Sequence, residues 1–522
     1  MSKTDTKALK EPDPGSRGVK LLFGGLVLSM FLASLNQTLL STALPTIAGE
    51  LNGVDQMFWV ITAFILVSTI TMPVYGRLRD LFGRKHLLVL AISFFMLGSA
   101  AGALSGNMMW LIVSRTIQGL GGGGLLILSQ TIIADVIPPR ARGRYIGILG
   151  SVFAISSIVG PLLGGWFTEG PGWRWVFWIN LPIGTLAMIA AVSFLRVPRP
   201  PSRHARIDWP GVLTLAVATT GLVFIGGTGG SRFAWNSFVI LCLIGMTTAS
   251  AALLFYIEKR ALNPIIPLHI FTDRNFNIAT LAGVLTVGIT MFGTVSYMPT
   301  YLQIASGASA TMAGLLMVPL MGSMVILSFI SGRFVSYSGR YKFLLVVGSA
   351  LVAAALILLS LVEVTTPLWV TCSVLALFGM GLGMTSQILV LIVQNSFPIT
   401  EVGAVTAASS YFRQVGASLS TAIVGSIFVY RLSNSPSGSL PDDAALSTSG
   451  PNSITPALVN ALPAEQSAPI VASFNEALMP MFPYIALIAL ASAILLCFLA
   501  EKPLAVSIEQ QGVDSARAAS KK

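Results

Sequence analysis

Long apolar runs separated by short polar stretches extend along the whole chain. A run of about twenty apolar residues can cross a bilayer as one helix. The pattern predicts about fourteen such helices, and this even number puts both termini on one side of the membrane. The predicted helices centre on residues 20–45, 56–76, 86–105, 108–135, 145–168, 175–195, 209–227, 237–257, 277–302, 311–331, 342–362, 367–395, 403–430 and 479–500. We therefore expect an all-α polytopic membrane protein.

The positive charges give this protein an orientation. Of the 31 lysines and arginines, only Arg174, Arg232 and Arg431 fall in odd-numbered loops, and Arg115 and Arg413 fall within spans. All the others lie in the two tails and the even-numbered loops, which the positive-inside rule assigns to the cytoplasm. Both the N- and the C-terminus are thus expected to be cytoplasmic.

A charged, glycine-bounded loop occurs twice, at residues 76–85 (the first latch) and at residues 332–342 (the second latch). The glycines and arginines match in pairs: Gly76/Gly332, Arg77/Arg333, Gly83/Gly339 and Arg84/Arg340. Each latch would join the second and third helices of a six-helix repeat, so the second repeat begins at helix nine. Helices seven and eight are then an inserted pair, which gives a 6+2+6 layout.

This layout divides the chain into segments with distinct roles. Residues 433–476 are rich in Ser, Pro and Ala, and we expect a solvated external loop there. The predicted segments are a cytoplasmic tail (1–19), an N-terminal six-helix bundle (20–195), a linker (196–208), the inserted helix pair (209–257), a second linker (258–276), a C-terminal six-helix bundle (277–500) and a tail (501–522).

The first latch and its surroundings predict a gate on the cytoplasmic side. We place Asp80 near the start of the following helix, where the macrodipole favours an anion. Asp135, at the inner end of helix four, needs a cation, supplied either by Arg140, Arg142 and Arg144 or by the first latch. The predicted gate residues are Gly76, Arg77, Asp80, Gly83, Arg84, Asp135, Gly332 and Arg340.

Polar side chains inside the apolar spans predict a pathway for substrate or protons. An unpaired arginine at the centre of a span costs about 2.5–3.5 kcal/mol on the insertion scale, so Arg115 and Arg413 must face a partner or a polar cavity. A purely structural role, as hydrogen bonds between helices, is the alternative. The candidate positions are Asn36, Gln37, Arg115, Gln118, Gln387, Gln394, Arg413 and Gln414. An adaptable apolar wall is expected from aromatic and methionine side chains, namely Phe58, Trp59, Met291, Phe292, Tyr297 and Met298.

Helix five carries a predicted hinge at Gly160, Pro161 and Gly164. Proline cannot donate a hydrogen bond to the preceding turn, and glycines remove bulk, so the helix should kink there. The glycine run at 119–124 lacks the lysine and the preceding strand of a nucleotide-binding loop, and close helix packing explains it.

Composition excludes several classes of protein. The net charge of +11 is spread over alternate loops and not over one face, so we expect no nucleic-acid partner. The three cysteines lie in apolar segments, which argues against a disulfide or a metal site. We find no convergent nucleophile, base or metal cluster, and therefore predict neither enzymatic activity nor a cofactor.

The ordered motifs resemble a known family. Residues 76–85 look like the cytoplasmic signature of the major facilitator superfamily, and the 6+2+6 count resembles its fourteen-helix drug:proton antiporter branch. The segment 115–119 is similar to that branch's intramembrane arginine motif, and Gly147 with residues 160–165 is similar to its antiporter motif. At position 36 members often carry a carboxylate, whereas this chain has an amide, which does not titrate near neutral pH.

The resemblance implies a secondary active transporter in the cell membrane. We expect multidrug-type efflux, as in antibiotic resistance, of small, mostly apolar or amphipathic molecules by alternating access, in exchange for protons. Asp135, Asp80 or Glu401 would carry the proton. We expect a monomer surrounded by lipid in a bacterial inner membrane. The alternative is an importer, or a transporter of lipids or anionic metabolites, with the same fold and no coupling through helix one.

Overall fold

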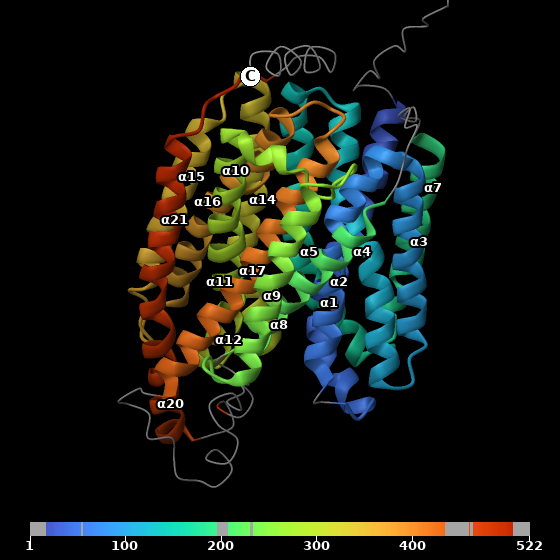
Figure 1. Cartoon of the computed structure of the whole chain (residues 1–522). Coiled ribbons are helices and arrows are strands. Elements are labelled where there is room, and N and C mark those ends of the chain that lie inside the picture. The colour runs from blue at the N-terminus through green and yellow to red at the C-terminus, as the bar shows by residue number, and fades with distance from the viewer. Residues whose placement is uncertain are drawn as a thin grey trace, which may run out of the picture.

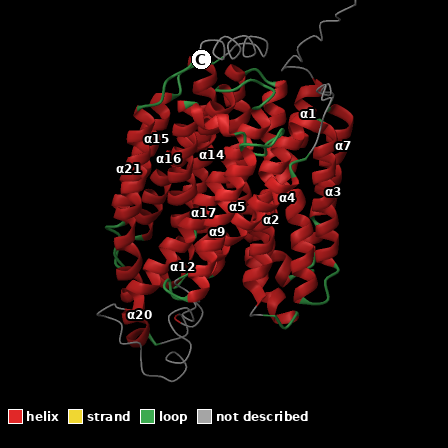
Figure 2. Cartoon of the chain, viewed as in Figure 1, coloured by secondary structure: helices red, strands yellow, loops and turns green. Residues whose placement is uncertain are grey.

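A bundle of long helices makes up the computed structural model, which describes residues 17–53, 56–195, 207–229, 233–433, 459 and 463–504 (Figure 1). Helices account for nearly all of these residues (Figure 2). Fourteen of them are long and apolar enough to cross a membrane, which confirms the predicted number of spans. Such helices satisfy their own backbone hydrogen bonds, as a bilayer interior requires.

The first half of the bundle contributes six spans. Its elements are α1 (Arg17–Glu50), α2 (Met57–Phe82), α3 (Arg84–Ala103), α4 (Met108–Val136), α5 (Pro139–Glu169), and a sixth span built from α6 (Trp175–Trp178) and α7 (Asn180–Phe194). Within this half, α4 packs against α2 and α3, and α1 packs against α5 and α7.

The second half repeats this arrangement with more interruptions. A short 3-10 helix, η2 (Leu268–Thr272), precedes it. Its spans are α10 (Arg274–Gly283) with the π-helix η3 (Val284–Met291), α11 (Phe292–Val295) and α12 (Met298–Ser306); α13 (Ala310–Leu316) with α14 (Val318–Ser338); α15 (Lys342–Leu359); α16 (Leu368–Asn395); α17 (Val402–Ser433); and α20 (Ala464–Leu478) with η5 (Met479–Met481) and α21 (Phe482–Cys497).

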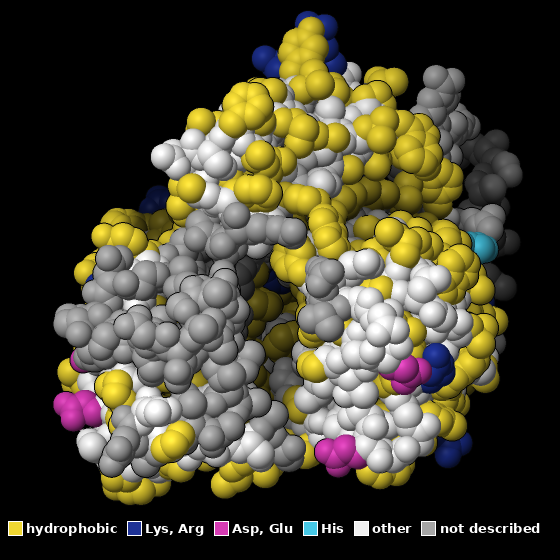
Figure 3. Space-filling view, turned by 90° about the horizontal axis from the view of Figure 1, so that it is seen from below, with side chains coloured by type: hydrophobic (Ala, Val, Ile, Leu, Met, Phe, Trp, Pro, Cys, Tyr) yellow, Lys and Arg dark blue, Asp and Glu magenta, His cyan; other side chains and the backbone are white. Residues whose placement is uncertain are grey.

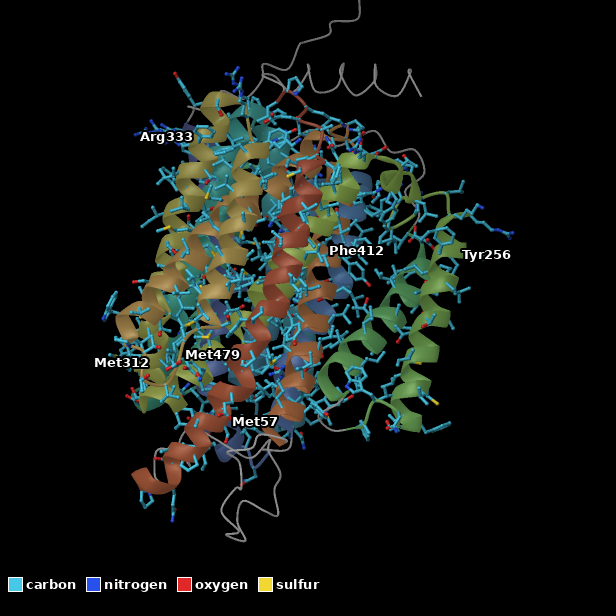
Figure 4. The ribbon with its side chains drawn as sticks, turned by 90° about the vertical axis from the view of Figure 1, so that its left-hand side faces the viewer. Met57, Tyr256, Met312, Arg333, Phe412 and Met479 are labelled. Atoms are coloured by element: carbon cyan, nitrogen blue, oxygen red, sulfur yellow. The ribbon has the colours of Figure 1, made fainter. Side chains whose placement is uncertain are left out.

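The inserted pair consists of α8 (Trp209–Thr228) and α9 (Phe238–Glu258), and it lies at one side of the molecule (Figure 4). α8 packs against α17 and α2, and α9 packs mainly on α8. Tyr256, on α9, points outward from this pair (Figure 4). The halves themselves meet through α5 against α14 and α2 against α17. The pair is therefore an addition outside the interface between the halves, as a 6+2+6 layout requires.

Both latches lie at one end of the bundle, which we call the latch end; the opposite end is the far end. Arg140, at the start of α5, donates to the carbonyl oxygen of Tyr337 in the second latch at 3.2 Å. Gly83 and Gly339 have φ of 92° and 73°. Backbone with positive φ in this range favours glycine, so each latch turns at the glycine that the sequence repeats.

The position of Asp80 differs from the prediction. α2 continues to Phe82 and α3 begins only at Arg84, so Asp80 belongs to the last turn of α2 and not to the start of the next helix. The helix ends at Phe82, where Gly83 permits the turn, and not at residue 76 as the sequence predicted. The side chain of Asp80 is outside the described part of the chain.

The predicted external loop at 433–476 was wrong from residue 464 onward, where α20 begins. Residues 434–458 and 460–462 lie outside the described residues. Ile470, Phe474 and Ala477 are spaced as on one helix face, and all three are buried. The helix packs against α12 and α17. Pro469 and the surrounding Ser and Ala residues concealed this amphipathic pattern in the sequence.

Close packing inside each half gives a first prediction. Gly381 of α16 lies so near α15 that an added Cβ would stand 2.5 Å from the carbonyl oxygen of Gly348. Gly381→Val should therefore force the two helices apart and destabilise the protein by about 1–3 kcal/mol, the usual effect of overpacking. Thermal unfolding of the purified protein in detergent measures this as a lower midpoint.

Gly245→Val on α9 is the matched control, because nothing lies within 4 Å of a Cβ added there. Its midpoint should stay close to that of the wild type. Equal midpoints for the two variants would contradict the tight α15–α16 packing.

Candidate functional site

A cavity of about 140 Å³ lies between the two halves. Helices α1, α2, α4 and α5 line it from the first half, and η3, α11, α14, α16 and α17 line it from the second. Phe153 and Met324, two of its lining residues, lie near the middle of their spans. Seen from the far end, the surface is hollowed near its centre, with hydrophobic side chains on the visible wall (Figure 3).

Three of the predicted pathway residues line this cavity, namely Gln387 on α16 and Arg413 and Gln414 on α17. The sequence reasoning missed Gln130, Ser386 and Ser410, which also line it. Nη2 of Arg413 donates to Oγ of Ser410 at 2.9 Å. A polar residue inside an otherwise apolar span was the available signal for all three, although serine is too common in membrane helices to stand out.

The rest of the wall is apolar and rich in methionine. Met30, Met72, Met291 and Met324 line the cavity together with aromatic rings such as Phe292. Of the six residues expected in this wall, Met291 and Phe292 line the cavity, whereas Phe58, Trp59, Tyr297 and Met298 do not. Because methionine has an unbranched, polarisable side chain, such a wall can repack around guests of different shape.

A second polar cluster surrounds Arg115 inside the first half. Nη1 of Arg115 donates to Oδ1 of Asn36 and to Oε1 of Gln118. Its Nε donates to the carbonyl oxygen of Val60 at 3.3 Å, and its guanidinium lies over the ring of Phe64, 4.2 Å from the centroid. Neutral oxygens and an aromatic face together stabilise the cation.

The cluster continues to α3 and α7 and is closed to solvent. Nε2 of Gln118 donates to Oγ of Ser99 at 2.7 Å, and Nδ2 of Asn180 donates to the same oxygen at 3.2 Å. Arg115 is 1% exposed, and Asn36 is fully buried. None of these residues lines the cavity. Sequence reasoning grouped Arg115 with the cavity residues, but the structure places it in the interior of one half.

Two further candidates lie near these sites. Gln37, next to Asn36, is half-buried. Gln394 on α16 is fully buried, and its Nε2 donates to the carbonyl oxygen of Gln130 on α4 at 3.4 Å. Gln394 therefore links the two halves on the latch side of the cavity.

Asp135, at the end of α4, forms a buried ionic cluster with two arginines. Nε of Arg84 lies 2.6 Å from Oδ2 of Asp135, and Arg79 pairs with Oδ1. The side chains of Arg79 and Asp135 are 0% and 2% exposed. The Arg84 pair was one of the predicted alternatives, whereas Arg79 was missed. Arg77 instead donates to Oδ1 of Asn263, at 3.3 Å, in the segment after α9.

The arginines that follow Asp135 in sequence have other partners. Arg142 donates to the carbonyl oxygens of Ala134 at 2.8 Å and Ile137 at 3.0 Å, so it satisfies the end of α4. The backbone N–H of Arg144 donates to Oγ of Ser336 in the second latch at 3.1 Å. Arg340 is exposed at the latch end.

Glycines bring the two halves into backbone contact at the latch end. A Cβ added to Gly332 would lie 2.4 Å from the carbonyl oxygen of Gly143, and one added to Gly76 would lie 2.7 Å from that of Gly403. Oγ of Ser328 donates to the carbonyl oxygen of Gly147 at 3.2 Å. The latch end is closed in this way, while the far end is hollowed.

The predicted hinge residues of α5 lie on different sides of the helix. Added Cβ atoms on Gly160 and Gly164 would clash with the hydroxyls of Thr38 and Thr42 on α1, so these glycines pack within their own half. Pro161 lines a small gap between α5 and the α13–α14 span. A hinge at these positions stays a prediction.

Comparison with known proteins identifies related sequences and a related fold. The family described as Major Facilitator Superfamily matches residues 26–421. An uncharacterized MFS-type transporter of Mycobacterium tuberculosis is 36% identical over 93% of this chain and 70% of its own. The multidrug transporter protein MdtP of Bacillus subtilis is 34% identical over 79% of this chain and 76% of its own. The multidrug resistance protein 3 of the same species is 33% identical over 78% of this chain and 79% of its own.

A solved structure has the same fold. The crystal structure of the human organic anion transporter MFSD10 (TETRAN) superposes with a TM-score of 0.58 over 91% of this chain and 99% of that one, at 17% sequence identity. At this low identity the likeness concerns the fold alone.

The ionic cluster at the end of α4 generates a second prediction. Asp135→Asn should destabilise the protein by about 3–5 kcal/mol, because it leaves the buried Arg79 without its counter-charge. The midpoint of thermal unfolding in detergent measures this loss. The double variant Arg79→Gln/Asp135→Asn should recover part of it, because the uncompensated charge is then removed.

Glu401→Gln is the matched control, because Glu401 pairs with His269 in a more exposed position, with side chains 31% and 57% exposed. Such surface pairs contribute only about 0–1 kcal/mol. If both single substitutions had the same small effect, the buried cluster would not hold the latch end together.

Proposed function

The chain belongs to the major facilitator superfamily of membrane transporters, and from this premise we propose that it exports small, mostly apolar or amphipathic molecules. The export is multidrug-type efflux by alternating access, in which the two halves rock about the cavity between them. The names of two relatives from Bacillus subtilis, a multidrug transporter and a multidrug resistance protein, support this substrate range.

The observation that carries the alternating-access part of the proposal is the asymmetry between the two ends of the bundle. Backbone contacts between the halves close the latch end, at Gly143 and Gly332 and at Gly76 and Gly403. The far end is hollowed toward the central cavity (Figure 3). If the cation-rich latch end lies in the cytoplasm, as the positive-inside rule predicts, this asymmetry corresponds to an outward-open state of an alternating-access transporter. The direction, export, is proposed from the names of the relatives.

Protons are the proposed coupling ion, and Asp135 is the proposed proton carrier. Its carboxylate compensates Arg79 and Arg84 in the closed latch end. A protonated carboxyl group can no longer do so, and the two cations then repel each other. Protonation would therefore favour opening of the latch end, which is the step that an exporter needs before it can take up its next substrate.

Membrane location follows in part from the fold. The chain is a multi-pass membrane protein with fourteen candidate spans among the described residues. We further propose a bacterial inner membrane, where a proton gradient is available to drive export.

Everted membrane vesicles test both export and coupling. With an acidified lumen, the neutral dye N-phenylnaphthylamine should accumulate inside, and its addition should speed the loss of luminal protons, which a pH-sensitive dye in the lumen reports. Vesicles without the chain should show neither effect. Asp135→Asn should lose the proton signal, because an amide does not titrate near neutral pH.

The same experiment tests export and proton coupling independently of each other. Accumulation of the dye without any proton movement at several pH values would refute proton coupling and leave export standing. The absence of dye accumulation in wild-type vesicles would refute export of apolar molecules.

A further inference from the structure

The central cavity has one charged side chain on its wall, Arg413, among the residues that the structure describes. It lies near the middle of α17 and donates to Ser410, a neutral partner, at 2.9 Å. Within the described ranges no acidic side chain forms an ion pair with it. A cation in a low-dielectric wall without a counter-ion attracts an anionic guest.

Unpartnered polar atoms belong to residues that line the same cavity as this cation. Oε1 of Gln130, Oγ of Ser386 and Oε1 of Gln387 are buried and have no hydrogen-bond partner. Gln130 is 7% and Ser386 is 3% exposed, and the two come from opposite halves of the protein. A buried polar atom without a hydrogen bond is energetically unfavourable, so these atoms favour the binding of a ligand with a polar group. Of these three atoms, the hydroxyl of Ser386 can donate to an anion, whereas the two amide oxygens accept hydrogen bonds and suit a donor of the guest or a water molecule.

Arg115 provides a comparison within the same protein, because its guanidinium is enclosed by hydrogen-bond acceptors and an aromatic ring. Two amide oxygens, a carbonyl oxygen and the ring of Phe64 surround Arg115 inside one half. It does not line the cavity, so no guest reaches it there. Arg413, in contrast, faces the space between the halves, where alternating access would carry the substrate.

We propose that the central cavity is an anion site, which binds the carboxylate or sulfonate of an amphipathic organic monoanion through Arg413. This inference rests on the proposed transport function and names its preferred substrate class. The planar guanidinium suits a bidentate contact with such an acid group. The methionines and phenylalanines of the wall, among them Met291, Phe292 and Phe153, hold the apolar body.

Size and charge restrict the guest further. A cavity of about 150 Å³ in another protein accepts benzene, and this one measures about 140 Å³. The present state therefore accommodates about one aromatic ring. A cationic guest would meet Arg413 with no carboxylate on the wall to offset the repulsion, so the site should discriminate against cations.

Three ring compounds of nearly identical shape test the inference, namely benzoate, benzamide and benzamidine, which are anionic, neutral and cationic at neutral pH. Their Kd values for the purified full chain in a non-ionic detergent follow from the ligand-dependent rise of the unfolding midpoint. We expect benzoate to bind about ten- to a hundred-fold more tightly than benzamide, as is typical of a charge-assisted hydrogen bond. Benzamidine should bind most weakly.

Substitutions assign the preference to one side chain. Arg413→Met should remove the advantage of benzoate and leave benzamide binding within about two-fold, because the methionine keeps an apolar wall. Arg413→Lys should retain most of the advantage, because it keeps the charge. Arg333→Met is the matched control for the loss of a cation, since Arg333 is exposed and points away from the bundle at the latch end (Figure 4).

Two results would overturn the anion site. One is equal binding of the three compounds by the wild type, which needs no variant and so does not depend on how Arg413→Met folds. The other is an undiminished benzoate preference in a folded Arg413→Met protein. Export of the neutral dye by a chain without benzoate preference would refute this inference alone. Benzoate preference in a chain that moves no dye and no benzoate would support the site and refute the transport function.

Discussion

The energetic cost of placing charge inside an apolar bundle governs the polar features of this protein. A charged side chain near the centre of a span costs about 2.5–3.5 kcal/mol on the insertion scale, so each arginine there needs compensation. Arg115, within a span, has amides and an aromatic ring. At the latch end, the buried Arg79 has the carboxylate of Asp135, and the buried Arg142 has the carbonyl oxygens at the end of α4. Arg413 has one hydrogen bond within the part of the chain that the structure describes, to the hydroxyl of Ser410, and it faces the cavity. The same constraint therefore distinguishes arginines whose partners lie within the protein from Arg413, which can also bind a ligand in the cavity.

The two latches repeat one backbone turn but are held by different chemistry. The first depends on a buried carboxylate between two cations, which salt screens little. In the second, Ser336 stands in place of the acid, and Glu501 accepts hydrogen bonds from the backbone N–H groups of Tyr341 at 2.8 Å and Lys342 at 3.3 Å. The duplication thus preserved the geometry of the turn, and among the described residues the buried carboxylate between two cations belongs to the first latch.

The sequence predicted those features that depend on one helix at a time. Span length and hydropathy are local, so the fourteen spans could be predicted, and positive φ at Gly83 followed from a turn between two helices. Features that depend on how helices rotate against each other could not be predicted. Arg77 and Arg79 point to different sides of α2, and the contact of Gly76 with α17 turns Arg79, and not Arg77, toward Asp135. For the same reason the sequence could not separate a sealed Arg115 from an Arg413 on the cavity wall.

An anionic cargo changes what the coupling mechanism has to supply. Export of a cation from a cell that is negative inside opposes the membrane potential by about 2.3 kcal/mol per charge at 100 mV, so a cation exporter needs strong proton coupling. Export of a monoanion is favoured by the same amount. If one proton enters as one anion leaves, two charge movements follow the potential, together about 4.6 kcal/mol at 100 mV. Such a transporter does not need a carboxylate in helix one to bind the cargo, and an amide at Asn36 can serve there as a neutral partner of Arg115. The amide at position 36 and the lone cation at position 413 are then two consequences of the same choice of substrate charge.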